Sequence, residues 1–497
     1  MGRFEGAEAY NRDMKCALAA AILVCAVVPA DSKETQHAEL LKLNVVALDA
    51  QGEPVSGLRS VDFQLLEDGK PQDIVFFRFT GDRAPQARPG PGEYSNRAGA
   101  ARHTTVVLID LLSERIISDS IIGQQVADSL RNLESSGGLY LYLLNASGEL
   151  YPIHTLPKPD TEAPSAAEPW TRNIVPMLQT ALNDLVHLKP VDDRDIKVRF
   201  DLTVHALRDL RSRLAQVPER KNLVWVTRGI PIVGFSASTQ SGLDFTGPLR
   251  FLCEELEQAQ IVVYTVDQST AQAGSAVGTL DEFTSITGGR GYSSGRAGDA
   301  IQQARTDSRA NYEIAYYSAS LNPDGKHHRI RVVCGRKDVR LQTEHGFYAM
   351  SSLVSPSGPA PSGFGSRELP PEVGTASHSA FDATEIGLRA SVSRDPAKAG
   401  NMRFVVHIDA ADLLPRPTRD PDSAKVFVAF VAYDESLKPF AHPILVSLTP
   451  GQFAAATQGD IGLSEAVPVP QGIRKFRVIA FDSALGAVGS VTIPMQR

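Results

Sequence analysis

The sequence is poor in the residues that build disulfide frameworks and cysteine-ligated metal sites. It contains four cysteines among 497 residues, and no two of them stand in a C-x-x-C arrangement. It also lacks an excess of positive charge, because 50 Lys and Arg residues face 57 Asp and Glu residues. The first absence excludes a disulfide-rich scaffold and a cysteine zinc site. The second argues against a nucleic-acid partner.

Long apolar runs are also missing, apart from one near the start of the sequence. Residues 16–28 (CALAAAILVCAVV) lead into Val28-Pro29-Ala30, which is typical of a signal-peptidase site. The run is shorter than the ~20 residues that span a bilayer. We therefore predict a signal peptide over 1–30 with cleavage near Ala30, and a short membrane anchor is the alternative. The mature protein is then expected to be secreted, periplasmic or held at the cell envelope, with no transmembrane span after signal removal.

The rest of the sequence divides by composition and periodicity. Alternating apolar residues around the turn Asp68-Gly69 predict a small β module near the start. Two later stretches rich in Pro, Gly or Ser are typical of linkers. The predicted order is a small β-sandwich-like module (38–80), a linker (81–102), an α/β domain (103–349), a second linker (350–379) and a β-sandwich domain (380–497).

Four short apolar runs alternate with helical patterns within the α/β domain. The first, Thr105–Asp110, is rich in β-branched residues and ends in an acid, and comparable runs cover 139–145, 222–227 and 261–267. Strands that alternate with helices favour an α/β fold with a doubly wound, mainly parallel sheet. Such sheets place their functional crevice at the carboxyl ends of the strands, so we expect the binding site there.

Asp110 begins a pattern that von Willebrand factor A-like (VWA) domains use to hold a divalent cation. Those domains place D-x-S-x-S after the first strand and an acid after the fourth, because carboxylate and hydroxyl oxygens suit Mg²⁺. Here Leu112 and Glu114 stand at the two serine positions of this pattern. Ser113, between them, still offers a hydroxyl. Arg228 stands where the later acid is expected. Since an arginine cannot lose its proton, we predict a degenerate site without a bound metal.

The predicted binding rim consists of Asp110, Ser113, Thr227 and Arg228. We expect Arg228 to pair with Asp110 and to take the electrostatic place of the metal; the alternative is that Asp110 caps the strand end and faces solvent. A further alternative is an atypical Mg²⁺ site built from Asp110, Ser113, Glu114 and Asp267.

Several segments together resemble the VWFA-related family abundant in Acidobacteria. They include V-S-G-L-x-x-x-D-F at Val55–Phe63, L-E-D-G-K-P-Q at Leu66–Gln72, LVWVTRGIP at Leu223–Pro231 and H-G-F-Y at His345–Tyr348. The resemblance implies an exported protein of unassigned function with a VWA-like, Rossmann-type sheet. It implies a binding scaffold rather than a reaction.

Catalytic patterns are weak. Ser113, Ser118 and Ser120 lack the context of a nucleophile elbow. His327 and His328 are adjacent near a hairpin turn and point to opposite faces of a strand, so solvated turn histidines are the expectation. Outside the predicted signal, Cys253 and Cys334 can form a disulfide or remain buried free thiols.

These observations favour a non-enzymatic exported protein that binds another protein or a cell-envelope component, in adhesion or assembly, without a cofactor. The alternatives are a metal-dependent adhesion domain with an atypical Mg²⁺ site and an enzyme of unrecognised type.

Overall fold

The computed structural model describes the greater part of the chain from residue 39 onward. The predicted signal peptide lies outside the described residues. These are 39–82, 89–98, 103–112, 126, 128, 138–159, 161, 176–182, 196–217, 219–230, 233–236, 241–268, 277–318, 326–349, 369–414, 425–433, 439–456, 459–469 and 471–495.

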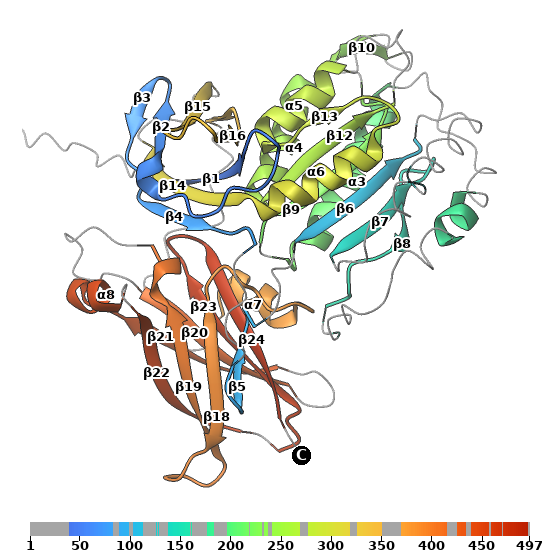
Figure 1. Cartoon of the computed structure of the whole chain (residues 1–497). Helices are drawn as coiled ribbons and strands as arrows, with labels where there is room; N and C mark the ends of the chain where they lie inside the picture. Colours follow the sequence, from blue (N-terminus) through green and yellow to red (C-terminus); the bar gives the residue numbers. More distant parts are fainter. Residues whose placement is uncertain are drawn as a thin grey trace, which may run out of the picture. The chain divides into compact units, whose positions relative to one another are not determined.

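A mixed six-stranded sheet carries the predicted binding rim (Figure 1). Five of its strands are parallel, and one edge strand runs antiparallel. The central strands are apolar runs buried along their whole length, as expected for strands covered on both faces. From edge to edge the strands are β13 (Gly291–Tyr292), β12 (Ile261–Asp267), β9 (Lys221–Thr227), β6 (Thr104–Asp110), β7 (Leu139–Leu144) and β8 (Leu150–His154).

Helices bury both faces of this sheet. The face that carries Trp225 packs against α3 (Ile196–Leu214), α4 (Thr246–Gln258) and α5 (Val277–Thr287). The opposite face, which carries Val224, packs against α6 (Ala297–Arg309). Each fully buried Val, Leu or Phe contributes roughly 1.5–3 kcal/mol to this core, so the strand ends at the rim are rigidly placed.

The predicted fold class is wrong. Of the six sheets in the described part of the chain, five are antiparallel, and parallel pairing is confined to the mixed sheet. The protein is therefore mostly antiparallel β-structure rather than a VWA-like α/β fold dominated by a doubly wound parallel sheet. The prediction gave too much weight to the βα alternation of 103–310 and too little to the strands that flank it.

Strands from the start of the described chain pair with strands that follow the mixed sheet. Thus β1 (Glu39–Leu48) pairs with β14 (Asn311–Ser318), and β2 (Phe63–Glu67) pairs with β15 (His327–Cys334). The other strands of these two sheets are β3 (Lys70–Gln72), β4 (Phe76–Phe79), β16 (Arg340–Gln342) and β17 (Gly346–Tyr348), and η1 (Ser60–Asp62) precedes β2. The small module predicted over 38–80 is thus completed by residues far along the chain.

Two four-stranded antiparallel sheets face each other in the C-terminal part. Phe404 from one sheet packs on Phe430 and Phe476 from the other, with ring centroids 5.1 and 4.9 Å apart. One sheet contains β5 (Glu93–Ser95), β18 (Leu388–Arg394), β19 (Asn401–Asp409) and β22 (Asp460–Pro468); the other contains β20 (Lys425–Tyr433), β21 (Pro439–Ser447), β23 (Lys475–Asp482) and β24 (Ala487–Pro494).

Both predicted linkers contain regular structure. The first supplies β5, which pairs with β18. The second supplies α7 (Pro371–His378), which packs on the outer face of the sheet that contains β20, β23 and β24. The remaining elements are the hairpin of β10 (Val233–Ser236) and β11 (Ser241–Asp244), η2 (Ala410–Asp412) and α8 (Pro450–Ala456). Within the described residues, no helix combines the length and the apolar character needed to span a membrane.

Candidate functional site

Asp110 is the last residue of β6 and is held at the carboxyl edge of the mixed sheet. The hydroxyl of Thr227, at the end of the neighbouring β9, donates to Oδ2 of Asp110 at 2.7 Å. The backbone N–H of Leu112 donates to Oδ1 at 3.0 Å. Parallel pairing of β6 with β9 brings the two strand ends to the same edge, so the sheet itself positions this contact.

The carboxyl group of Asp110 is buried, with 7% of the residue exposed. Burial raises the pKa of Asp110 because a charge loses its hydration there, while the hydrogen bonds from Thr227 and Leu112 and the charge of Arg199 act in the opposite direction. The expected alternative of a solvent-facing strand cap is therefore wrong. Asp110 is a buried acceptor that needs its surrounding donors.

Arg199, near the start of α3, is a member of the site that sequence reasoning missed. Its Nη2 donates to the carbonyl oxygen of Gly229 at 3.3 Å, and its charge acts on Asp110. No pattern marks this residue in the sequence, because it reaches the rim from a helix rather than from a strand end. Its only signal is that α3 leads into β9 and so begins at the edge where β6 ends.

The predicted ion pair between Asp110 and Arg228 is not formed. Within the described residues, Thr227, Leu112 and Trp225 donate to Asp110, and the nearby cation is Arg199. Successive residues at a strand end point to opposite sides. Arg228, the residue after β9, is half-buried.

Two of the four residues of the alternative Mg²⁺ site, Asp110 and Asp267, end the strands on either side of β9. Thr227 uses its hydroxyl proton on Asp110 and its oxygen to accept from the N–H of Gly229 at 3.0 Å. Asp267 is half-buried and in register with Thr227. Two candidate ligands, Ser113 and Glu114, lie outside the described residues.

Buried N–H donors surround the rim. Arg199 Nε and Nε2 of Gln268 are buried and have no hydrogen-bond acceptor within the described part of the chain, and the indole N–H of Trp225 is directed at Asp110. The backbone N–H of Gln268 donates to the carbonyl oxygen of Thr227 at 2.8 Å, which fixes Gln268 beside the strand end. A buried donor without an acceptor costs roughly 1–3 kcal/mol. The rim is therefore suited to a ligand rich in acceptors.

Two other sequence expectations are decided by the structure. Cys253 and Cys334 are free thiols, so the disulfide between them is not formed. The stretch Gly291-Tyr292-Ser293-Ser294-Gly295 matches G-x-S-x-G and lies between β13 and α6, a match that the sequence analysis missed. Ser293 is exposed. Among the described residues no histidine donates to it or accepts from it, so the structure shows no activated nucleophile there.

Comparisons with known proteins leave the family open. No family profile and no curated protein sequence matches the chain. Among solved structures, the human COPII-coat protein Sec24c shares 12% identity at a TM-score of 0.28, over 50% of this chain and 43% of that chain. Proximal thread matrix protein 1 from the mussel byssus shares 10% identity at a TM-score of 0.23, over 44% and 47%. The chain spans less than half the length of either protein, and these similarities carry no argument about function.

Proposed function

We propose that this chain is an exported, non-enzymatic binding protein that contacts a protein or cell-envelope partner through the carboxyl edge of the mixed sheet. Three observations made above support a binding rather than a catalytic role. Asp110 is fixed by Thr227 and Leu112. The rim is bordered by buried donors that lack acceptors within the described residues. No nucleophile with an adjacent base stands beside them in the described part of the chain.

The donors define the chemistry of the partner group. Guanidinium and amide N–H groups donate and do not accept, and a guanidinium binds a carboxylate through two parallel hydrogen bonds. Arg199 and Arg228 supply two guanidinium groups at this edge. We therefore expect an acidic side chain or a carbonyl-rich segment of the partner to lie against the rim.

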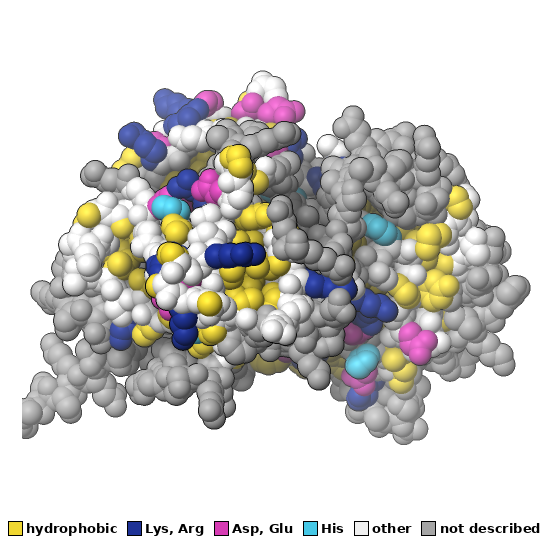
Figure 2. Space-filling model, turned by 90° about the horizontal axis from the view of Figure 1, so that it is seen from below, with side chains coloured by type: hydrophobic (Ala, Val, Ile, Leu, Met, Phe, Trp, Pro, Cys, Tyr) yellow, Lys and Arg dark blue, Asp and Glu magenta, His cyan; other side chains and the backbone are white. Residues whose placement is uncertain are grey.

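The net charge of the chain favours a protein partner over a polyanion. On the face shown in Figure 2, Lys and Arg side chains lie among Asp and Glu side chains and form no continuous basic patch. The net charge of −7 points in the same direction.

The test is partner capture from the native envelope fraction with three forms of the chain: wild type, Arg228→Glu at the rim, and Arg336→Glu as the control. Arg336 is exposed and pairs with Asp338, away from the mixed sheet. We expect one partner to bind wild type and Arg336→Glu, to be lost with Arg228→Glu, and to rebind after purification. Equal capture by all three forms contradicts the proposal, as does hydrolytic turnover that disappears in Asp110→Asn.

A further inference from the structure

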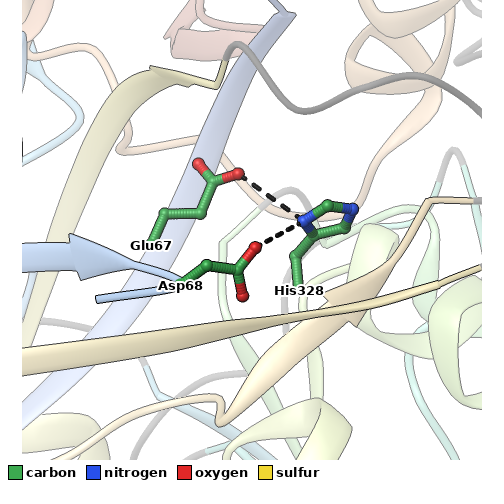
Figure 3. Close-up of side chains that lie close together, drawn as sticks. All are labelled: Glu67, Asp68 and His328. Carbon is green, nitrogen blue, oxygen red and sulfur yellow. Dashed lines mark hydrogen bonds and ion pairs between the residues drawn. The ribbon is translucent and has the colours of Figure 1, made fainter. Parts of the chain in front are cut away.

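Glu67, Asp68 and His328 converge at one end of the β2–β15 strand pair (Figure 3). One ligand atom from each lies within 4.8 Å of the other two. His328 Nδ1 is 2.9 Å from Asp68 Oδ2 and 3.9 Å from Glu67 Oε1. Figure 3 shows both carboxylates directed toward that nitrogen. The three side chains therefore surround a common point.

Each carboxylate also accepts a hydrogen bond from a donor outside the cluster. The backbone N–H of Arg329 donates to Oδ1 of Asp68 at 2.8 Å, which leaves Oδ2 directed at His328. The hydroxyl of Ser318 donates to Oε1 of Glu67 at 2.9 Å. Groups that orient ligands in this way are typical of metal sites, where they fix the geometry of the binding residues.

One oxygen of a buried carboxylate at this point accepts no hydrogen bond among the described residues. Glu67 is 2% exposed, and its Oε2 accepts no hydrogen bond there. The neighbouring Tyr316 is fully buried, and the charge of Glu67 acts on its hydroxyl. Burying a carboxylate is costly unless it is paired or binds a cation. The cluster therefore has the electrostatics of a site that holds positive charge.

We propose that Glu67, Asp68 and His328 bind a divalent transition-metal ion, zinc in the first instance. An imidazole nitrogen with two carboxylate oxygens suits zinc, whereas Mg²⁺ and Ca²⁺ prefer oxygen ligands alone. Tetrahedral zinc with bonds near 2.1 Å places its ligand atoms about 3.4 Å apart, which lies between the two distances from His328 Nδ1. The ion would tie the β2–β3 hairpin to β15, and the fourth position would face the exposed side of Asp68.

The ion would take the place of the proton that His328 Nδ1 and Asp68 share. Without metal, His328 and Asp68 share a hydrogen bond; with metal, both donate lone pairs to the ion. This site is separate from the rim at Asp110, and it does not depend on the function proposed above.

The test uses the untagged full chain, dialysed against Zn²⁺ and assayed for bound metal by mass spectrometry and calorimetry. Asp68→Asn is the decisive variant, because Asn tolerates the left-handed backbone at this position (φ 48°) and keeps an oxygen for the N–H of Arg329. His328→Gln removes the nitrogen ligand. His327→Gln is the matched control, since its ring packs on Tyr348 instead.

We expect one Zn²⁺ per chain in wild type and in His327→Gln, and binding weaker by at least about tenfold in Asp68→Asn and His328→Gln. Co²⁺ in place of Zn²⁺ should give visible absorption bands that both ligand variants lose. Absence of bound Zn²⁺ in wild type, or binding by Asp68→Asn equal to that of wild type, overturns the proposal.

Discussion

Thr227 and Asp110 join the ends of two neighbouring parallel strands by a hydrogen bond of 2.7 Å between side chains. The donor is a hydroxyl and the acceptor is a carboxylate that burial disfavours as a charge. The contact therefore links the stability of the sheet edge to the protonation state of one acid. It also fixes the rim on which the proposed function depends.

Replacing Thr227 by Val removes the hydroxyl while keeping the shape of the side chain. The carboxylate of Asp110 then loses one of its hydrogen bonds, and we expect the free energy of unfolding to fall by about 1–3 kcal/mol. Urea denaturation followed by circular dichroism measures the change. Thr227→Ser, which keeps the donor, should lose less; equal losses in the two variants would show that the methyl group, not the hydrogen bond, matters.

Arg78 is buried between acids from distant parts of the chain. Its guanidinium donates to Glu313 and to the backbone carbonyl oxygen of Glu385, and Nη1 lies 3.9 Å from Asp412. Removing one partner of a buried ion pair typically costs about 3–5 kcal/mol, so Arg78→Met should lower the urea midpoint strongly. Arg336→Met, at an exposed ion pair, should leave the midpoint unchanged. A small effect of Arg78→Met would mean that water reaches Glu313.

Glu254 on α4 is 3% exposed and accepts a hydrogen bond from the backbone N–H of Tyr348 at 2.8 Å. Burial raises its pKa from 4.5 to about 7. Between these two pH values the folded chain holds a proton on Glu254 that the unfolded chain has released. The contribution of this group to the free energy of unfolding therefore falls as the pH rises, and it is lost above about pH 7.

Glu254→Gln keeps the acceptor and removes the titration. We expect the variant to be more stable than wild type at pH 8 by up to ~3 kcal/mol, and the difference to shrink toward pH 4.5. Guanidinium unfolding at a series of pH values measures it. A difference that does not change with pH would refute the assigned pKa shift.

Gly289 leaves no room for a side chain. A Cβ atom at this position would lie 1.8 Å from the carbonyl oxygen of Val263 in β12. Because that neighbour is backbone, Gly289→Ala should destabilise the fold by more than ~4 kcal/mol. Gly291→Ala is the control, since its Cβ would meet only Thr265 Oγ1 at 3.5 Å. Thermal melts of the two variants compare them, and similar melting temperatures would contradict the clash.

Local patterns predicted individual strands well but not their partners. The run predicted over Thr105–Asp110 differs from β6 by one residue, and that over 222–227 differs from β9 by one residue. Apolar runs of this kind report burial, which is a local property. The pairing of β1 with β14 joins segments that no periodicity relates, and it is this long-range pairing that made the predicted fold class wrong.

The same limit applies to the two sites. Asp110 and Thr227 could be placed together because each ends a strand of one sheet. Asp68 and His328 are 260 residues apart, and the sequence offers only a turn acid and a pair of histidines. Their proximity depends on the register between β2 and β15, which is set by packing of side chains such as Leu65 and Ile330 on both strands.

The pairing of β1 with β14 and of β2 with β15 also sets an order on folding during synthesis. The first described strands leave the ribosome long before residues 311–334, and β1 lies between β14 and β16 in the finished sheet. Until those strands arrive, β1 exposes apolar residues and open hydrogen-bonding edges, the features that promote aggregation. A nascent chain halted near residue 310 would thus expose both edges of β1.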